Sequence, residues 1–443
     1  MKLTISDQSE TRKDVIVTID AETVGAEESK IVKQFIKEAK IRGFRPGKVP
    51  ESRIRQLYAK EIMQELKRSL MNKAVREVSD QEDLELVAVV DFPEPGDPVA
   101  GQEITLDLTV DVVPPFELPV YEGLELEVPS TDVSDQEIDA AIDRIRRQRA
   151  DFDVVERPAA VEDYVKVSYT PTLDGESIEA QIAEQANLRA WGAVKEGWEE
   201  AGTEEAKRYG VAEVIDAIVG MAAGETKSVE VLIPDEFPIE SLRGKTVAYA
   251  ITAHEVRERR LPELDEAYFK SVGAESLEDY KAQVLDSIEG QKRNERVRIE
   301  HGLISQKLLQ SVEFDLPETM LEEERQQAVI NMMGRSYEQG ISQDELESHK
   351  DEIFAAANES ANREVKLRIL LSRIAEKEGI EVSNEDLSKA AYSVATQRRQ
   401  KLDDYVKELQ KDSAQLRQLQ RQVLSVKTVN RIAERAVRKI ISQ

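Results

Sequence analysis

The chain has 443 residues, a formal net charge of −27 and 34% charged residues. This length suggests about three domains of the usual ~150 residues each, and the negative charge argues against general nucleic-acid binding, including DNA binding. The sequence contains no cysteine and only three scattered histidines. Disulfides, thiolate metal sites and a cysteine nucleophile are therefore excluded, and we expect no metal and no cofactor.

The N-terminal stretch MKLTISDQSETRKD has no apolar segment of signal-peptide length, and no run of 18 apolar residues occurs in the sequence. We therefore expect a cytoplasmic protein without a membrane partner.

The first 113 residues have the pattern of an α+β domain. DVIVTIDA, LELVAVVDF and ITLDLTVDVV alternate as strands do, whereas IVKQFIKEAKI and IRQLYAKEIMQELKRSL have helical spacing. Between these two helical segments stands GFRPGKVP (43–50), in which two glycines and two prolines interrupt the helices around an aromatic residue. The glycines allow a sharp turn, and the prolines stiffen the loop, which reduces the entropy lost on docking.

This loop lies in a basic segment of an acidic chain. From Lys30 to Arg76 there are 14 lysines and arginines and four acidic residues, a local excess of ten positive charges. Such a patch favours docking on an anionic surface. A solvated helix face is the alternative explanation of the charge.

The middle of the chain begins with a proline-rich stretch. Seven of the fifteen prolines lie between Pro93 and Pro129, and VVPPFELPVYEGLELEVP is typical of an extended connector. A capping box at Ser134 and Glu137 then predicts a helix. Residues 158–256 have strand patterns, with VKVSYTPTLDGE as a hairpin, interrupted at 178–210 by a segment that we expect to be helical.

After Leu261 the pattern is helical, and the 126 residues after Pro317 contain no proline. We expect helices to restart at Ser342 and Ser383, where capping boxes occur. The apolar residues there are small or flexible and aromatic residues are sparse, which favours an open bundle with arm-like helices over a coiled coil.

Together these features resemble the trigger factor family of ribosome-associated bacterial chaperones. The motifs GFRPGKVP (43–50), RERRLPELDEAYFK (257–270) and FDLPETMLEEE (314–324) carry the resemblance, which extends over the whole chain. It implies a multidomain α+β fold. The implied parts are a ribosome-binding domain (1–113), a linker with a helix (114–157), an FKBP-like prolyl isomerase domain with a helical insertion (158–256), and an elongated, all-α client-cradling domain (257–443).

The resemblance also implies partners and a function. It implies an ATP-independent chaperone that binds nascent and unfolded polypeptides at the peptide exit tunnel, with roles in protein transport and cell division and a homodimer off the ribosome. The docking surface would be ribosomal protein and rRNA of the large subunit. The implied contact residues are Arg42, Gly43, Phe44, Arg45, Gly47 and Lys48. Pro46 stands where family members often carry a second cation, so docking would rely more on Arg42 and Lys48.

The C-terminal helices resemble the family's chaperone body. Met332 and Met333 are candidate client-binding residues, because flexible side chains repack around different partners; ordinary core positions are the alternative. We expect a fragment that begins near Leu261 to retain most of the cradle.

For the isomerase domain, the resemblance and the residues disagree. Tyr169 and Phe237 occupy aromatic positions of the family's catalytic pocket, but Ile178 stands where a phenylalanine is usual. Such isomerases hold a twisted prolyl amide in a dry, aromatic-lined pocket.

In the segment that forms the family's pocket floor, Ala212, Glu213 and Val214 replace a proline, a glycine and an aromatic residue. A carboxylate at the floor of a pocket that works by desolvation predicts weak or absent activity. Trp191 and Trp198, seven residues apart on one face of the expected helix, would cover the barrel mouth, bind clients or simply pack.

Three alternatives to the chaperone remain. The first is an active prolyl isomerase acting on nascent chains, and the second is an RNA-binding module, which the net charge opposes. The third is a periplasmic chaperone of similar helical build, which the absence of a signal-peptide pattern opposes.

Overall fold

The computed structural model describes residues 1–41, 44–45, 47–81, 84–99, 101–183, 186–338, 341 and 343–441. The chain divides into two compact units, Met1–Ser130 with Glu295–Gln443, and Thr131–Asn294. Each unit has its own hydrophobic clusters. In these described ranges, no helix is both long and apolar enough to cross a membrane.

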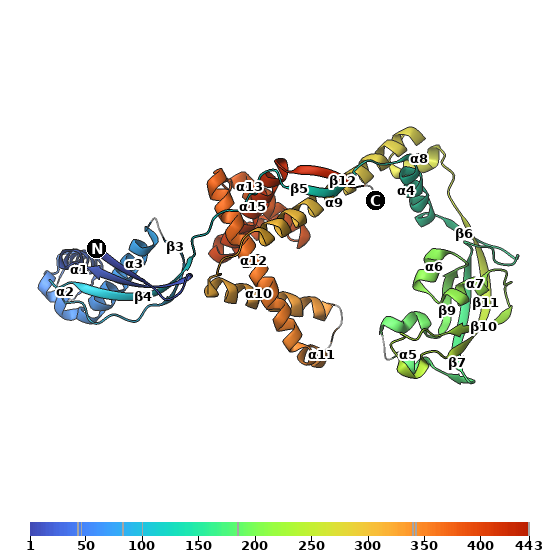
Figure 1. Ribbon diagram of the computed structural model, residues 1–443, viewed down its shortest axis with the longest axis horizontal. Coiled ribbons are helices and arrows are strands. Elements are labelled where there is room, and N and C mark those ends of the chain that lie inside the picture. The colour runs from blue at the N-terminus through green and yellow to red at the C-terminus, as the bar shows by residue number, and fades with distance from the viewer. Residues whose placement is uncertain are drawn as a thin grey trace. The chain divides into compact units, whose positions relative to one another are not determined.

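The first unit begins with an antiparallel sheet in the strand order β1-β2-β4-β3 (Figure 1). Its strands are β1 (Lys2–Asp7), β2 (Arg12–Ile19), β3 (Glu85–Asp91) and β4 (Ile104–Val113). Alternate residues of β2 and β4 point into one core, as the sequence pattern predicts. The sequence did not predict β1, because KLTISD offers only two apolar residues to show the alternation.

Three helices cover the apolar face of this sheet: α1 (Ala21–Glu38), α2 (Glu51–Leu57) and α3 (Ala59–Ser79). Asp20 caps α1, accepting a hydrogen bond from the Thr23 amide at 2.8 Å. α3 buries a stripe with four-residue spacing, made of Ile62, Leu66, Leu70, Ala74 and Val78. The expected second helix is thus two helices, which meet at Tyr58.

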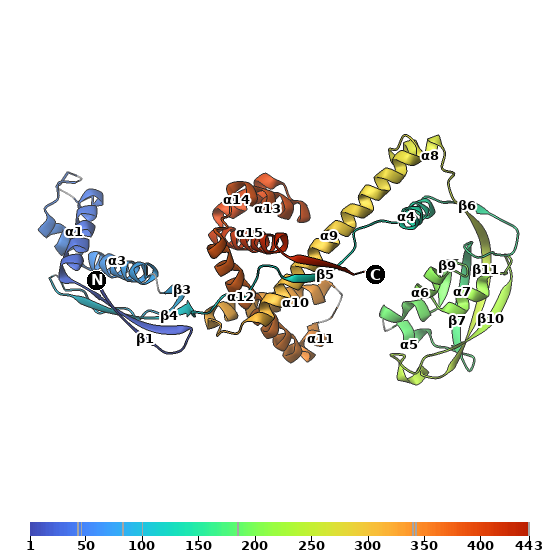
Figure 2. The same cartoon turned by 45° about the horizontal axis from the view of Figure 1, so that its top comes forward.

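The remainder of this unit is mainly helical, as expected. Its helices are the later part of α9 (Leu277–Ser311), α10 (Glu318–Glu338), α11 (Gln343–Ser348), α12 (Lys350–Glu378), α13 (Asn384–Gln397), α14 (Leu402–Lys411) and α15 (Ser413–Glu434). The capping box at Ser383 is present, whereas Ser342 lies outside the described residues. α10 and α12 pack side by side (Figures 1 and 2).

The connector after β4 is extended, as predicted, but it is built into the helical body. Its strand β5 (Glu125–Pro129) pairs in parallel with β12 (Val437–Ile441). Leu126 and Val128 are fully buried among residues of α9, α12 and α15. β12 is an exception to the expected all-helical C-terminal region.

The second unit contains a six-stranded sheet and a small helical cluster. The strands are β6 (Asp151–Val154), β7 (Tyr164–Leu173), β8 (Glu176–Ser177), β9 (Val194–Glu200), β10 (Thr226–Leu232) and β11 (Thr246–Arg260). β7 and β8 form the predicted hairpin, in which Asp174 and Gly175 have φ angles of 50° and 86°. The helices are α4 (Asp135–Gln148), α5 (Glu179–Ala183), α6 (Glu204–Tyr209), α7 (Ala212–Ile218), α8 (Glu266–Val272), the first part of α9, and the 3₁₀ helices η1 (Ala186–Trp191) and η2 (Glu240–Leu242).

The helical prediction for residues 178–210 is wrong in its centre. The segment contains α5, η1, the strand β9 and α6. β9 pairs antiparallel with β7, and Trp198 lies opposite Lys166. Trp191 and Trp198 therefore belong to a 3₁₀ helix and a strand, and they do not share a helix face. Short helices and strands of this kind have no sustained period that a sequence pattern could show.

Candidate functional site

The loop between α1 and α2 presents an aromatic and two cationic side chains to solvent. Phe44 is 42% exposed, and Arg45 and Lys48 are also exposed. Gly47 has φ +79°, a conformation that L side chains rarely adopt. The loop is closed by a hydrogen bond from the Lys48 amide to the Arg45 carbonyl at 3.0 Å, and the buried Val49 anchors its base. Arg42, Gly43 and Pro46 lie outside the described residues.

The cations of this domain fall into two groups. Acidic neighbours pair with Lys30, Arg55, Lys67, Lys73 and Arg76. Within the described ranges, by contrast, Arg45 and Lys48 have no acidic partner. These five cations are therefore neutralised inside the domain, whereas the charge of the loop remains available to an external anion. In the described ranges, the same holds for the other basic side chains of the segment that have no ion pair: Lys33, Lys37, Lys40, Arg53, Lys60 and Arg68.

In the second unit, the two candidate catalytic aromatics are buried. Tyr169 is 4% exposed, and its hydroxyl donates a hydrogen bond to the Glu199 carboxylate at 3.1 Å. Burial, followed by the charge of Glu199, raises the pKa of Tyr169, and burial raises the pKa of Glu199. Phe237 is 5% exposed and makes an edge-to-face contact with Trp191, with the ring centroids 5.2 Å apart.

The segment after the β7–β8 hairpin fills the space around these aromatics. Ile178, Ile182 and Leu188 are each at most 6% exposed and belong to the same core cluster as Tyr169 and Phe237. The neighbouring Tyr249 is also fully buried, and its hydroxyl donates to the Trp191 carbonyl at 2.8 Å. These aromatic surfaces therefore pack against the protein's own side chains.

The floor segment differs in one respect from the sequence prediction. α7 buries Val214, Ile215 and Ile218, whereas Glu213 is exposed. The expected burial of a carboxylate at the floor is thus wrong, because Glu213 lies on the solvent side of this short helix. Burial of Tyr249 is the main cause that raises the pKa of this tyrosine, and the negative charge of Glu213 is the second cause.

The two tryptophans have different environments. Trp191 is partly buried and packs against the core. Trp198 is 41% exposed, and the Arg257 guanidinium lies 4.5 Å from its ring centroid. Packing against the core therefore explains why a tryptophan stands at position 191, whereas the Arg257 guanidinium covers part of the Trp198 ring through a cation–π contact.

An apolar hollow of about 190 Å³ is formed by the C-terminal end of α10, by α11 and by the N-terminal end of α12. Its lining residues are Val329, Met333, Tyr337, Leu346, Glu347, Lys350, Ile353 and Phe354. Met333, Tyr337 and Phe354 are 36%, 50% and 45% exposed. Met332, the other candidate, is half-buried and does not line the hollow.

The sequence prediction missed Tyr337 and Phe354. They are two of only four aromatic residues after Pro317. The scarcity of aromatic residues in this highly charged stretch was the available signal, but it could not separate Tyr337 and Phe354 from the other two, because only the fold shows which side chains share one exposed apolar patch.

Comparisons with known proteins agree with this architecture. Residues 1–145 match the family model of the bacterial trigger factor protein, and residues 276–434 match that of its C-terminus. The trigger factor of Opitutus terrae is 35% identical over 98% of this chain and 98% of its own length. This chain belongs to the trigger factor family. The protein is therefore a ribosome-associated chaperone of a family that binds ribosomes and nascent chains.

Other trigger factors are more distant in sequence. That of Akkermansia muciniphila is 28% identical, and the alignment covers 93% of each chain. A solved trigger factor chaperone structure, concerned with promiscuous substrate recognition in folding and assembly, is 19% identical with a TM-score of 0.47 and covers 98% of this chain and 99% of that chain. The family assignment confirms the resemblance found in the three sequence motifs.

Proposed function

We propose that the protein docks on the large ribosomal subunit beside the exit tunnel through Phe44, Arg45 and Lys48. The observation that supports this proposal is one exposed aromatic ring in the same short loop as two cations that have no acidic partner in the described ranges. Guanidinium and ammonium groups suit rRNA phosphates and acidic protein surfaces, and a ring adds apolar or stacking contact. Arg42, Gly43 and Gly47 would complete the loop.

Co-sedimentation with purified ribosomes tests this assignment. The protein should pellet with ribosomes at low salt and be released progressively as the salt concentration rises, because charged contacts are screened. Binding that is indifferent to salt would count against a docking surface built around Arg45 and Lys48.

A second proposal places a client-binding surface at the joined ends of α10 and α12. Met333, Tyr337 and Phe354 offer apolar surface beside Glu347 and Lys350, which gives an apolar hollow with a charged rim. Such a surface binds many unfolded sequences weakly, since it needs no specific partner group. Met332, which is half-buried on α10, would contribute to client binding beside this hollow.

The client proposal predicts a local effect of two substitutions. Tyr337→Ser with Phe354→Ser should weaken protection of a refolding client from aggregation by about tenfold, as expected for losing two half-exposed aromatic side chains. Tyr392→Ser is the matched control, because Tyr392 is 63% exposed on α13, outside the hollow. Equal protection by the double variant and the control would place client binding elsewhere.

We further propose that prolyl isomerase activity is weak or absent. The support is that Tyr169, Phe237 and Tyr249 are packed in one core with Ile178 and Ile182. A prolyl peptide would have to displace these side chains before an aromatic surface could shield its twisted amide, whose rotation barrier is ~18–20 kcal/mol.

A protease-coupled assay on a short Xaa-Pro peptide checks this. The full-length protein should accelerate isomerisation little above the uncatalysed rate. Rapid turnover that disappears in Phe237→Ala, while the circular dichroism spectrum is preserved, would contradict the proposal and establish an active enzyme.

The remaining proposals rest on the family resemblance and the sequence. We propose that the protein acts in the cytoplasm, without ATP or another cofactor, and forms a homodimer off the ribosome, which sedimentation velocity would test. We also propose the functional division into 1–113, 114–157, 158–256 and 257–443.

A further inference from the structure

A buried carboxylate joins the N-terminal sheet to the first turn of α10. Asp111, near the end of β4, is completely buried. The Arg12 guanidinium of β2 donates to its two oxygens at 2.7 and 3.1 Å. On the other side, the Thr319 amide donates to the same carboxylate at 3.1 Å, and the Thr319 hydroxyl also donates to it. One side chain of the sheet is thus shared by a neighbouring strand and by a helix 208 residues away.

The position of Asp111 explains why the carboxylate is stable there. Thr319 is the second residue of α10, so Asp111 meets the unsatisfied amides and the positive end of this helix. Burial alone would raise the pKa of Asp111, but the hydrogen bonds from Arg12 and Thr319 outweigh it and hold the pKa below its usual value. Arg12 pairs with the charge from within the sheet, and two further hydrogen bonds to the carboxylate exist only while α10 is seated against the sheet.

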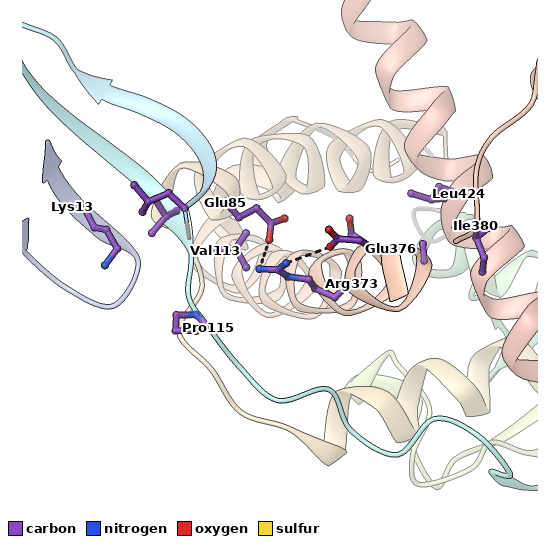
Figure 3. A pocket seen from close by; sticks show the side chains of 12 residues that line it. Lys13, Glu85, Val113, Pro115, Arg373, Glu376, Ile380 and Leu424 are labelled. Atoms are coloured by element: carbon purple, nitrogen blue, oxygen red, sulfur yellow. Dashed lines mark hydrogen bonds and ion pairs between the residues drawn. The ribbon is translucent and has the colours of Figure 1, made fainter. Parts of the chain in front are cut away.

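Further contacts surround this carboxylate. Val113 packs in one cluster with Leu321, Val365 and Ile369 of α10 and α12. Nearby, Arg373 of α12 lies 2.7 Å from Glu85 of β3 and 3.3 Å from Glu376 (Figure 3). A hollow of about 630 Å³ lies beside this ion pair. The interface is therefore incompletely packed, and directional polar bonds hold a larger share of it than in a dense core.

We propose that Asp111 is a latch that fixes α10 to the docking domain, so that the two move as one piece. The helix α10 has 21 residues and is therefore about 30 Å long, at 1.5 Å per residue. One end meets the sheet, and the other carries Met333 and Tyr337. The consequence for clients rests on the proposed function: a domain docked through the 43–50 loop would set where the apolar hollow points.

Loss of the latch leaves hydrogen-bonding groups unsatisfied on both sides, although Asp111 keeps its ion pair with Arg12. If α10 leaves the sheet, Asp111 loses two hydrogen bonds at its buried carboxylate, and α10 loses its N-terminal acceptor. Hydrogen bonds to charged groups are among the stronger ones in proteins. Weakening the latch should therefore raise the population of an undocked arm while leaving the sheet and the helices folded.

The absence of cysteine allows a direct distance measurement. Spin labels are attached through Asp107→Cys on β4 and Gln326→Cys on α10, both exposed positions, and their distance distribution is measured by pulsed electron paramagnetic resonance on the full-length protein without ribosomes. The parent should give one narrow distribution. Thr319→Val should raise the population at other distances by about tenfold, as expected for losing a hydrogen bond to a charged group, and Thr319→Ser should restore the narrow distribution.

Two further variants complete the test. Asp111→Asn should broaden the distribution at least as much as Thr319→Val, whereas Asp7→Asn, which removes an exposed carboxylate paired with Lys13 on the same sheet, should leave it unchanged. Should Asp111→Asn unfold the sheet, Thr319→Val decides, because Thr319 is not part of the sheet. A narrow, parent-like distribution in a folded Thr319→Val protein would overturn the latch, whatever the outcome of the ribosome and client assays.

Discussion

The triple variant Phe44→Ala, Arg45→Ala and Lys48→Ala should bind ribosomes at least about 100-fold more weakly than the parent, because an apolar contact and two charged hydrogen bonds each contribute about 1.5–3 kcal/mol. Helical content should be unchanged, since all three side chains are exposed. Co-sedimentation over a ribosome titration measures the affinity, and circular dichroism measures the fold.

The matched control removes the same amount of charge from the same domain. Lys30→Ala with Arg76→Ala deletes two exposed cations that already have acidic partners, Glu27 and Asp80. This double variant should bind ribosomes almost as well as the parent, and its binding should depend on salt to a similar degree. If it lost as much affinity as the triple variant, net charge would explain docking and the loop assignment would be wrong.

The distinction between these two groups of cations was only partly available from the sequence. The count of 14 basic residues between Lys30 and Arg76 marked the region correctly, but it could not show which of them are neutralised. Glu27, for example, precedes the basic segment, yet its carboxylate forms ion pairs with Lys30 and Lys73. The pair with Lys30 has a local helical spacing that the sequence shows, whereas Lys73 meets Glu27 only because α1 and α3 pack together.

Local signals predicted many elements, and tertiary contacts explain the failures. Capping boxes at Ser134 and Ser383 begin helices as expected, because each box is satisfied within four residues. Asp111, in contrast, continues the outward positions of the ITLDLTVDVV pattern and should face solvent. It is buried because α10 covers that end of the sheet, and no short-range pattern contains this information.

Residues 158–256 show the same limit. The family resemblance marked Ile178, Ala212, Glu213 and Val214 as unusual. In the structure Ile178 and Val214 are buried, Ala212 is half-buried and Glu213 is exposed. The prediction that the charge of Glu213 would be buried assumed that the floor segment keeps the family's backbone. In the structure the segment is the helix α7, so positions three residues apart, Glu213 and Asp216, face solvent while the residues between and after them face the core.

A chaperone fragment that begins at residue 114 should fold, whereas one that begins at residue 261 should not. The shorter fragment was expected to retain the cradle, but it lacks Phe116, Tyr121, Leu126 and Val128, which pack into the helical body. Phe116 stacks on Phe314 with the ring centroids 4.2 Å apart. Burying each such side chain contributes about 1.5–3 kcal/mol, so their total rivals the ~5–15 kcal/mol stability of a typical protein.

Thermal unfolding followed by circular dichroism separates the two fragments. Residues 114–443 should unfold cooperatively and protect a refolding client from aggregation, while residues 261–443 should melt without a clear transition, because β12 has lost its only pairing strand in the described ranges. Within the longer fragment, Leu126→Ala should lower the free energy of unfolding by about 2–5 kcal/mol. Glu127→Ala, at the exposed position between two buried residues of β5, should change it by less than about 0.5 kcal/mol. Cooperative unfolding of residues 261–443 with the same midpoint would show that the connector is dispensable to the helical core.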